Sequence, residues 1–158
     1  MPGTDLVTVV TSTYQFHPEY TSPHGPWVWV FASNESGTHR KGSAKVAGLN
    51  FRAVAGVVSG PTGNAYALTT FDHRHKLLPM ARIETEVAEF LDYARANPSQ
   101  NFFVTRIACA PGQLLDSTMA ALFARASSNC SLPQAWMPHI MGQRALKTAA
   151  DSTTKETP

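Results

Sequence analysis

Three short stretches of the sequence combine small residues with side chains that could bind an anion or transfer a proton. The first, residues 32–44, contains the basic tripeptide His39-Arg40-Lys41 followed by Gly42. A helix is expected to begin at this lysine or glycine, and the N–H groups at a helix start attract anions, as basic side chains do. The stretch is therefore either a clamp for a phosphate or diphosphate, or a solvated, charged entrance to the helix.

Two polar residues precede the tripeptide in the same stretch. Asn34 could hydrogen-bond a ribose hydroxyl or a base edge, or it could cap the loop through its own backbone. Ser33 is not expected to act as a nucleophile, because no Gly-x-Ser-x-Gly motif surrounds it and no Asp–His pair accompanies it. Both interpretations of Asn34 stay open from the sequence.

The second stretch, residues 71–79, offers the best acid–base chemistry in the chain. If the protein is an enzyme, Asp72 with His73 or His75 is the expected general acid–base pair, because histidine titrates near neutral pH. The two histidines could share a metal ion, but the spacing suggests no third ligand, so no metal site is expected. A ligand contact and a solvated loop are the alternatives.

The third stretch, residues 108–113, is a loop of small residues around Cys109. A catalytic thiol needs a partner that lowers its pKa, and the sequence indicates none. Cys109 is therefore expected to be structural, and Cys130 to be a plain free thiol. Two cysteines also provide neither a disulfide framework nor a set of four zinc ligands.

An aromatic segment near the start of the chain is a further candidate. It could stack a base, or it could form a hydrophobic lid over a sheet edge or a homo-oligomer contact. The residues of this segment are Tyr14, Phe16, His17, Tyr20, Trp27 and Trp29.

The elements that must position these stretches alternate between strands and helices. Strands are expected over residues 6–13, 27–31, 64–70 and 101–107, with a short extended piece at 57–58. Helices are expected from residue 41 or 42 to about 54, over 81–96, and from residue 116 or 117 onward. The alternation predicts an α/β fold, with a mixed or mainly parallel sheet and helices on both faces. Because ligands bind at the carboxyl ends of such strands, the three stretches could form one site.

Periodicity also predicts which helix faces are buried. The first helix should bury Ala44, Ala47, Phe51 and Val54; the second Ile83, Val87, Phe90, Leu91 and Ala94, with Glu84, Glu86 and Glu89 outside; the third Met119, Leu122, Phe123 and Ala126. Three prolines predict that residues 14–26 form a loop. Residues 134–140 could add a short edge segment anchored by Trp136.

Composition and charge limit the class of protein. With 158 residues, 43% hydrophobic and 15% charged, the chain fits one folded domain, expected over residues 1–141, followed by a disordered tail over 142–158. A net charge of +2 favours a small anionic ligand, and duplex nucleic acid is not expected as a partner. Without a signal peptide or a long apolar run, no membrane association and a cytoplasmic location are expected.

The three stretches resemble, in the same order, three motifs of divergent macrodomains, a version common in small phage and bacterial proteins. The first family motif, Gly-Ser-Asn and then Gly-x-His-Gly-x-Gly-x-Ala, is matched by ASN at 32–34 and GTHRKGSA at 37–44. The second, Tyr-Ala-Ile/Leu-Pro-Thr-Lys-Asp, is matched by YALTTFD at 66–72, and the third, Val-Thr-x-Ile-Gly-Cys-Gly, by VTRIACA at 104–110. The resemblance covers about residues 27 to 136.

Macrodomains bind ADP-ribose and related nucleotides. The resemblance therefore implies a three-layer α/β/α fold and a small nucleotide ligand, such as ADP-ribose or a cyclic nucleotide, held between the first and third stretches without a cofactor. The ligand-binding residues that it implies are Ser33, Asn34, Gly37, His39, Arg40, Lys41, Gly42, Thr70, Asp72, Ala108, Cys109, Ala110 and Gly112.

The chain departs from the family where catalysis is concerned. Some macrodomains hydrolyse ADP-ribosyl bonds, and one branch uses a lysine where this chain has Phe71; an acidic residue expected in the third stretch is also missing. Family glycines are replaced at Ala32, Arg40, Ala108 and Ala110. Each replacement adds a Cβ where a glycine permits a positive φ or a close approach of the backbone to phosphate.

Three functions follow as expectations. The first is a binder that sequesters a nucleotide signal of host immunity without turning it over, as a phage protein acting against host defence would. The second is a hydrolase of ADP-ribosyl or cyclic nucleotide bonds that uses Asp72 and a neighbouring histidine. The third is a protein-interaction module with the aromatic segment as its surface and a vestigial pocket.

Overall fold

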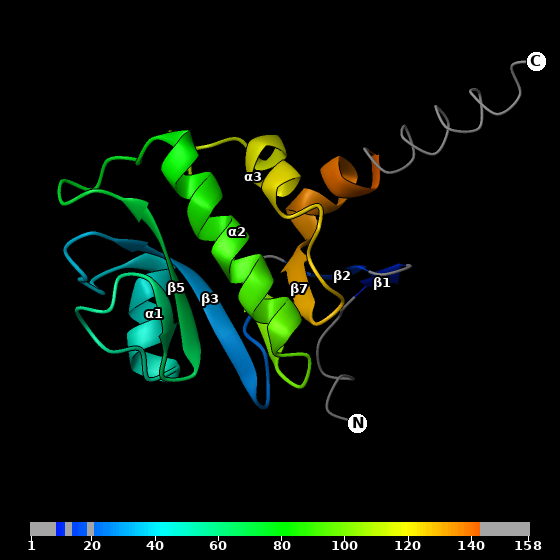
Figure 1. The fold of residues 1–158 in the computed structure, drawn as a ribbon, viewed down its shortest axis with the longest axis horizontal. Coiled ribbons are helices and arrows are strands. Elements are labelled where there is room, and N and C mark those ends of the chain that lie inside the picture. Colours follow the sequence, from blue (N-terminus) through cyan, green and yellow to red (C-terminus); the bar gives the residue numbers. More distant parts are fainter. Residues whose placement is uncertain (1–8, 12–13, 19–20, 143–158) are drawn as a thin grey trace, which may run out of the picture.

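The computed structural model describes residues 9–11, 14–18 and 21–142, and these form seven strands with helices on both faces of one sheet (Figure 1). The strands are β1 (Val9–Thr11), β2 (Tyr14–His17), β3 (Trp27–Asn34), β4 (Gly60–Thr62), β5 (Ala65–Phe71), β6 (Asn101–Val104) and β7 (Cys130–Pro133). The helical elements are α1 (Gly42–Asn50), α2 (Met80–Ala96), α3 (Asp116–Leu122), the 3-10 turn η1 (Gln134–Trp136) and a helical run over residues 137–142. The predicted α/β fold is confirmed.

The sheet brings the carboxyl ends of its inner strands to one edge. The strand order is β1-β2-β7-β6-β3-β5-β4. Neighbours from β2 to β5 in this order run parallel, whereas β1 and β4 pair antiparallel at the two outer positions. The predicted mixed sheet is therefore confirmed, and the loops that follow β3, β5 and β6 leave from the same edge.

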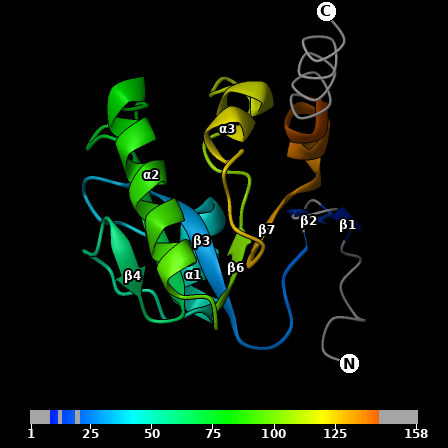
Figure 2. The same ribbon diagram turned by 45° about the vertical axis from the view of Figure 1, so that its right-hand side comes forward.

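The two faces of the sheet carry cores of different size. Helices α2 and α3 cover one face with the larger core, which includes Phe90, Phe102 and Met119. Helix α1 covers the other face over a smaller core around Trp29 and Phe31. Figures 1 and 2 show α2 in front of the sheet and α1 behind it. This three-layer arrangement leaves the second face with a single short helix.

Helix α2 confirms the clearest helical prediction, with one correction. Its predicted apolar stripe is buried, but Glu86, expected outside, is only 4% exposed. The Glu86 carboxylate accepts hydrogen bonds from the Ser59 hydroxyl at 2.8 Å and from the Thr69 backbone N–H at 3.3 Å. Strand β4 pairs with β5 only as far as Ala67, so the carboxylate satisfies a strand N–H beyond that register.

Helix α1 is shorter than predicted, and the prediction for Val54 was wrong. The helix ends at Asn50, because Arg52 adopts a left-handed backbone with φ of 59°. Val54 lies beyond this break and is 58% exposed, while Phe51 still packs by stacking on Trp29 at 4.9 Å. The expected extended piece at residues 57–58 is not a strand; β4 begins at Gly60.

Two parallel strands were not predicted. Residues 14–17, expected within a loop, form β2, because the first proline lies at Pro18 and leaves the preceding residues able to pair. Residues 130–133 form β7, which lies between β2 and β6 inside the sheet. The segment expected to be an edge, residues 134–140, is instead the turn η1 and a helical run, although Trp136 is fully buried, as predicted.

The remaining predictions differ mainly at element ends. Helix α3 begins at Asp116, as predicted; its N-cap is Leu115, and no side chain caps this helix. Met119, Phe123 and Ala126 are buried as predicted, whereas Leu122 is only partly buried. Residues 6–8 and 12–13 of the first expected strand and residues 143–158 of the expected tail lie outside the described residues. Within the described part of the chain, no helix is long and apolar enough to span a bilayer.

Candidate functional site

Two adjoining cavities lie at the edge where the parallel strands end. The large cavity has a volume of about 660 Å³ and the small cavity about 370 Å³. Five residues line both and form the wall between them: Ala32, Lys41, Ala44, Phe71 and Gln113. We call the two cavities together the cleft. Its lining includes residues from all three loops, so the structure brings the three stretches together.

Aromatic rings form the floor of the large cavity. The His17 ring stacks on Phe103 with 3.7 Å between centroids, and Phe103 stacks on Trp29 at 5.3 Å with an angle of 6° between planes. All three residues line the cavity and are nearly buried. Part of the aromatic segment, which was expected to stack a base or to form a lid or an oligomer contact, thus forms a cavity floor that suits a flat apolar group.

His17 is a structural residue of this floor. Its Nδ1 lies 2.8 Å from the Ser131 hydroxyl oxygen, which ties β2 to β7. Burial lowers the pKa of His17 from 6.5 to about 3, and the hydrogen bond of the ring to the Val104 backbone opposes this only in part. The ring is therefore neutral at physiological pH and supplies no charge to a ligand.

The small cavity is polar and basic. Arg40, Lys41 and His75 line it together with Asn34 and Thr38. Arg106 lines the large cavity, where its charge is paired with Asp116, and no aspartate or glutamate of the described residues lines either cavity. The basic lining of the small cavity favours an anionic ligand.

Asn34 sets the shape of the first loop. Its Oδ1 accepts hydrogen bonds from the backbone N–H groups of Ser36 at 3.1 Å and Thr38 at 3.4 Å, and its Nδ2 donates to the Thr38 carbonyl at 3.2 Å. Of the two interpretations of Asn34, the structure supports the loop cap. The residue still lines the small cavity. Ser33 is buried and donates its hydroxyl to the Val58 carbonyl, so it does not face the cleft.

A close backbone contact between Gly37 and Gly56 also holds this loop in place. Gly37 has a φ of +71°, and a Cβ on it would lie 2.6 Å from the Gly56 Cα. The Gly56 N–H donates to the Gly37 carbonyl at 3.0 Å. Gly37 therefore has a structural reason to be glycine, and it lines neither cavity.

Only part of the basic tripeptide faces the cleft. The His39 ring turns toward the protein, where it meets Phe31 edge-on at 5.4 Å, and its Nε2 is buried without a hydrogen-bond partner among the described residues. Burial lowers the pKa of His39 below 6.5. His39 lines neither cavity, so the structure does not support its expected contact with a ligand. Arg40 and Lys41, in contrast, are exposed and line the small cavity.

The first turn of α1 adds backbone donors to the same wall. Lys41 is the N-cap, and no side chain caps this helix end. Gly42, with a φ of +62°, lines the large cavity. The first helical bond runs from the Lys45 N–H to the Lys41 carbonyl, so the preceding N–H groups are the ones that the helix itself leaves for other acceptors.

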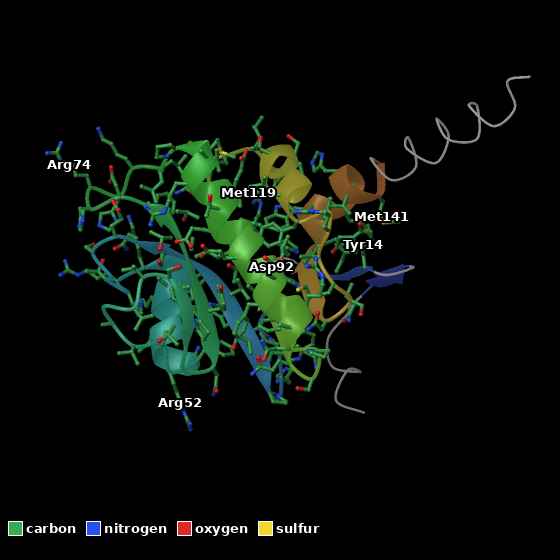
Figure 3. The ribbon with its side chains drawn as sticks, in the orientation of Figure 1. Tyr14, Arg52, Arg74, Asp92, Met119 and Met141 are labelled. Atoms are coloured by element: carbon green, nitrogen blue, oxygen red, sulfur yellow. The ribbon has the colours of Figure 1, made fainter. Side chains whose placement is uncertain are left out.

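The second loop does not form the expected acid–base pair. Asp72 Oδ1 accepts hydrogen bonds from the backbone N–H groups of Lys76 at 2.9 Å and Arg74 at 2.7 Å, and these bonds hold the pKa of Asp72 below 3.8. Asp72 thus shapes its own turn. Neither Asp72 nor the exposed His73 lines a cavity, and Arg74 projects away from the molecule (Figure 3). Of this loop, His75 reaches the small cavity.

Two further residues expected at the ligand are buried elsewhere. Thr70 is fully buried and lines neither cavity. Cys109 donates its thiol to the Ile107 carbonyl at 3.2 Å, and burial, with the nearby charge of Asp116, raises the pKa of its thiol to about 12. A thiol that stays protonated is not a nucleophile at neutral pH, so the structural role predicted for Cys109 agrees with its surroundings.

The third loop begins with a residue in a left-handed backbone conformation. Ala108, where the macrodomain motif has a glycine, has a positive φ of 57°. Ala108 and Ala110 line the large cavity, whereas Gly112, with a φ of +82°, does not. Arg40 and Ala110, where that motif also has glycines, keep ordinary negative φ values. Ala108 thus keeps the backbone conformation of a glycine without being one.

Comparisons with protein-family models, with curated proteins and with solved structures found no match. Any function assigned to the cleft therefore has to be inferred from the residues that line it. Among the described residues, no group of three or more histidine, cysteine, aspartate or glutamate side chains could hold a metal ion.

Gln113 and Arg106 are among the cleft residues that sequence reasoning missed. Gln113 lies within the third stretch and lines both cavities. Arg106 lines the large cavity, and its Nε donates to Asp116 Oδ1 at 2.8 Å. Asp116 also accepts a hydrogen bond from the indole of buried Trp136 at 3.0 Å. The only sequence signal for Arg106 and Gln113 was that each is a basic or amide residue close to the end of a predicted strand.

Proposed function

We propose that this chain binds a nucleotide of the ADP-ribose type, or a related nucleotide, and holds it without turning it over. The observation that carries the proposal is the meeting of the three loops around one cleft at the carboxyl edge of the parallel strands. A large cavity with an aromatic floor suits a base, and a small basic cavity suits a sugar with a phosphate beside it. The macrodomain resemblance names the same class of ligand from the sequence.

The charge of the cleft supports an anionic ligand. Arg40 and Lys41 form no ion pair with any described residue, so neither has its charge neutralised by a neighbour. The start of α1 adds backbone N–H groups and the positive end of the helix dipole at the same wall. A diphosphate at this wall would meet donors from side chains and from the backbone.

The lack of an acid–base pair among the described cleft residues supports binding over hydrolysis, because His75 lines the small cavity without an aspartate or glutamate in the lining. Phe71 stands where one hydrolytic branch of the family has a lysine, and it lines both cavities. Asp72 accepts hydrogen bonds within its own turn and lies outside the lining. A protein of this kind would sequester a nucleotide, for example a signal of host immunity. A cytoplasmic location and a homo-oligomer stay predictions from the sequence.

Ligand screening tests the proposal. Calorimetry and thermal shift are carried out with ADP-ribose, cyclic ADP-ribose isomers, NAD and cyclic dinucleotides. We expect saturable binding of at least one of these ligands, and recovery of that ligand unchanged after the protein is heat-denatured. Absence of binding to all of them would refute the proposed function, and recovery of a cleaved product would show a hydrolase instead.

A further inference from the structure

Glu86 of α2 is the one buried aspartate or glutamate among the residues that the structure describes, with an exposure of 4%. Burying a charged carboxylate is unfavourable unless hydrogen bonds replace the lost hydration. The donors here are the Ser59 hydroxyl at 2.8 Å and the Thr69 backbone N–H at 3.3 Å. The Arg82 guanidinium lies further away, at 4.0 Å, on a side chain that is 47% exposed. Glu86 therefore connects α2 mainly to two segments at the edge of the sheet.

One of these segments is residues 56–59, which lead into β4 and which we call the strap. None of the strap residues is buried, so apolar packing contributes little to its position. Hydrogen bonds hold it instead. The Val58 carbonyl accepts from the Thr69 hydroxyl at 2.5 Å and from the Ser33 hydroxyl. Together with the bond from Ser59 to α2, these bonds fix the strap to β3, β5 and α2.

The strap also contacts the first loop of the cleft. The Gly56 N–H donates to the Gly37 carbonyl at 3.0 Å, and the two backbones lie too close for a Cβ on Gly37. The Gly37 N–H in turn donates to the carbonyl of Asn34, which lines the small cavity. A continuous series of contacts therefore leads from Glu86 through the strap to a wall of the cleft, although Glu86 lines neither cavity.

We propose that Glu86 is a positioning residue for the cleft. Its buried carboxylate holds the strap, and the strap holds the first loop in the shape that lines the small cavity. The inference rests on the proposed function for its effect on ligand binding, whereas its effect on the loop requires no ligand. It gives α2, which contributes no residue to the lining of either cavity, a part in shaping the cleft.

Backbone amide hydrogen exchange, measured by NMR on the protein without ligand, tests the effect on the loop. The Gly56 N–H reports on the strap, and the Leu114 N–H, which donates to the Ala108 carbonyl, reports on the third loop. In Glu86→Ala the Gly56 amide should exchange about tenfold faster, because a hydrogen bond to a charged group is lost. The exchange of the Leu114 amide should change by less than about twofold. An equal rise at both amides, or no change at Gly56, would overturn the inference.

Three further variants separate positioning from a general loss of stability. Glu86→Gln should exchange like wild type at Gly56, because its amide oxygen can accept from the Thr69 N–H and its nitrogen can donate to the Ser59 hydroxyl. Ser59→Ala removes one hydroxyl from an exposed residue and should reproduce the faster exchange in part, which keeps the test decisive if Glu86→Ala does not fold. Glu89→Ala is the matched control, because it changes the net charge equally at an exposed site of the same helix.

Calorimetry with ADP-ribose measures the effect on the cleft. Glu86→Ala should bind about three- to tenfold more weakly than wild type, and Glu89→Ala should bind equally well. Unchanged affinity in Glu86→Ala, combined with faster exchange at Gly56, would overturn the positioning role while leaving the proposed function standing. Absence of wild-type binding would instead refute the proposed function, and the exchange rates would still decide whether Glu86 holds the first loop.

Discussion

The first and third loops face each other across the cleft but are held in different ways. The first, residues 34–41, is fixed by side-chain bonds from Asn34 to the backbone and by the contact of Gly37 with Gly56. The third, residues 108–113, is held mainly by backbone bonds, including that from the Leu114 N–H to the Ala108 carbonyl at 2.9 Å. The first loop uses its polar asparagine for its own shape, whereas the third relies mainly on backbone hydrogen bonds, to which the Ala110 N–H adds one to Gln113 Oε1.

This difference predicts that the base of the first loop and the side chains in the cleft respond differently to substitution. Changes at the base of the first loop should lower stability, because they break contacts that build the wall. Changes to side chains that face the cleft should alter ligand affinity and leave the free energy of unfolding nearly unchanged. The four predictions below test this division, from the largest expected effect to the smallest.

Gly37→Ala should cause the largest loss of stability. The added Cβ meets the Gly56 Cα at 2.6 Å, and the residue has a φ of +71°. We expect the free energy of unfolding to fall by about 2–4 kcal/mol, measured by urea denaturation. Gly112→Ala is the matched control in the third loop, because its φ is +82° but no atom lies within 4 Å of an added Cβ. Its expected cost is about 1 kcal/mol. Equal losses of stability in the two variants would show that the contact between Gly37 and Gly56 does not stabilise the first loop.

Acid should weaken the floor and the first loop before the third loop. Burial lowers the pKa of His17 in the folded protein from its usual 6.5 to about 3. Its contribution to stability is complete above the unfolded pKa and is lost as the pH falls from there toward 3, a loss of about 2–3 kcal/mol near pH 4.5. His39, whose pKa is also lowered, acts in the same direction. Asp116 has a pKa held below 3.8, mainly by Arg106, so its contribution persists in this window.

Urea denaturation near neutral pH and near pH 4.5 measures this effect. The His17→Gln variant is expected to be less stable than wild type at neutral pH, because its packing on Phe103 is lost. Its stability should, however, fall less on acidification. A pH dependence identical to that of wild type would show that His17 is not its source.

Removing both exposed cations of the first loop should weaken binding with little effect on folding. For Arg40→Ala combined with Lys41→Ala, we expect a loss of roughly 1.5–3 kcal/mol for each charged hydrogen bond to an anionic ligand. Calorimetry measures this loss. Lys45→Ala is the matched control, because Lys45 is exposed on α1 and lines neither cavity. Unchanged affinity in the double variant would place the anion contact elsewhere.

Ala108→Gly should have the smallest effect, and it should be stabilising. Relief of the left-handed strain at φ of 57° is partly offset by the greater freedom of glycine in the unfolded chain. A net gain of about 0.5 kcal/mol is expected. Ala110→Gly, at a residue without positive φ, should instead lose about 0.5–1 kcal/mol. Thermal denaturation of both variants checks the difference in sign.

Strong local patterns in the sequence were enough to predict most of the fold. The apolar stripe of α2 and the apolar runs of β3, β5 and β6 identified their elements, since each carries a clear periodicity or a continuous apolar run. Strand β7 was missed because CSLP is short and half polar, and β2 because the prolines that follow it suggested a loop. Both are stabilised by long-range pairing, which local sequence does not encode.

The candidate site was predicted at the level of loops but not of side chains. Arg40, Lys41, Gly42, Ala108 and Ala110 line the cleft as expected. His39, Ser33, Thr70 and Cys109 turn inward, because the direction of a side chain near a strand end depends on register and on loop twist. Gln113 went unnoticed because the sequence alone does not show that the third loop brings this residue to both cavities.

The unequal division of the core between the two faces of the sheet bears on how this chain can change over generations. Most large buried side chains, among them Phe90, Phe102 and Trp136, lie on the face covered by α2 and α3. The cleft opens on the face that carries α1 alone and the smaller core. Substitutions in the lining of the cleft can therefore accumulate on one face while the larger core on the other face preserves the fold.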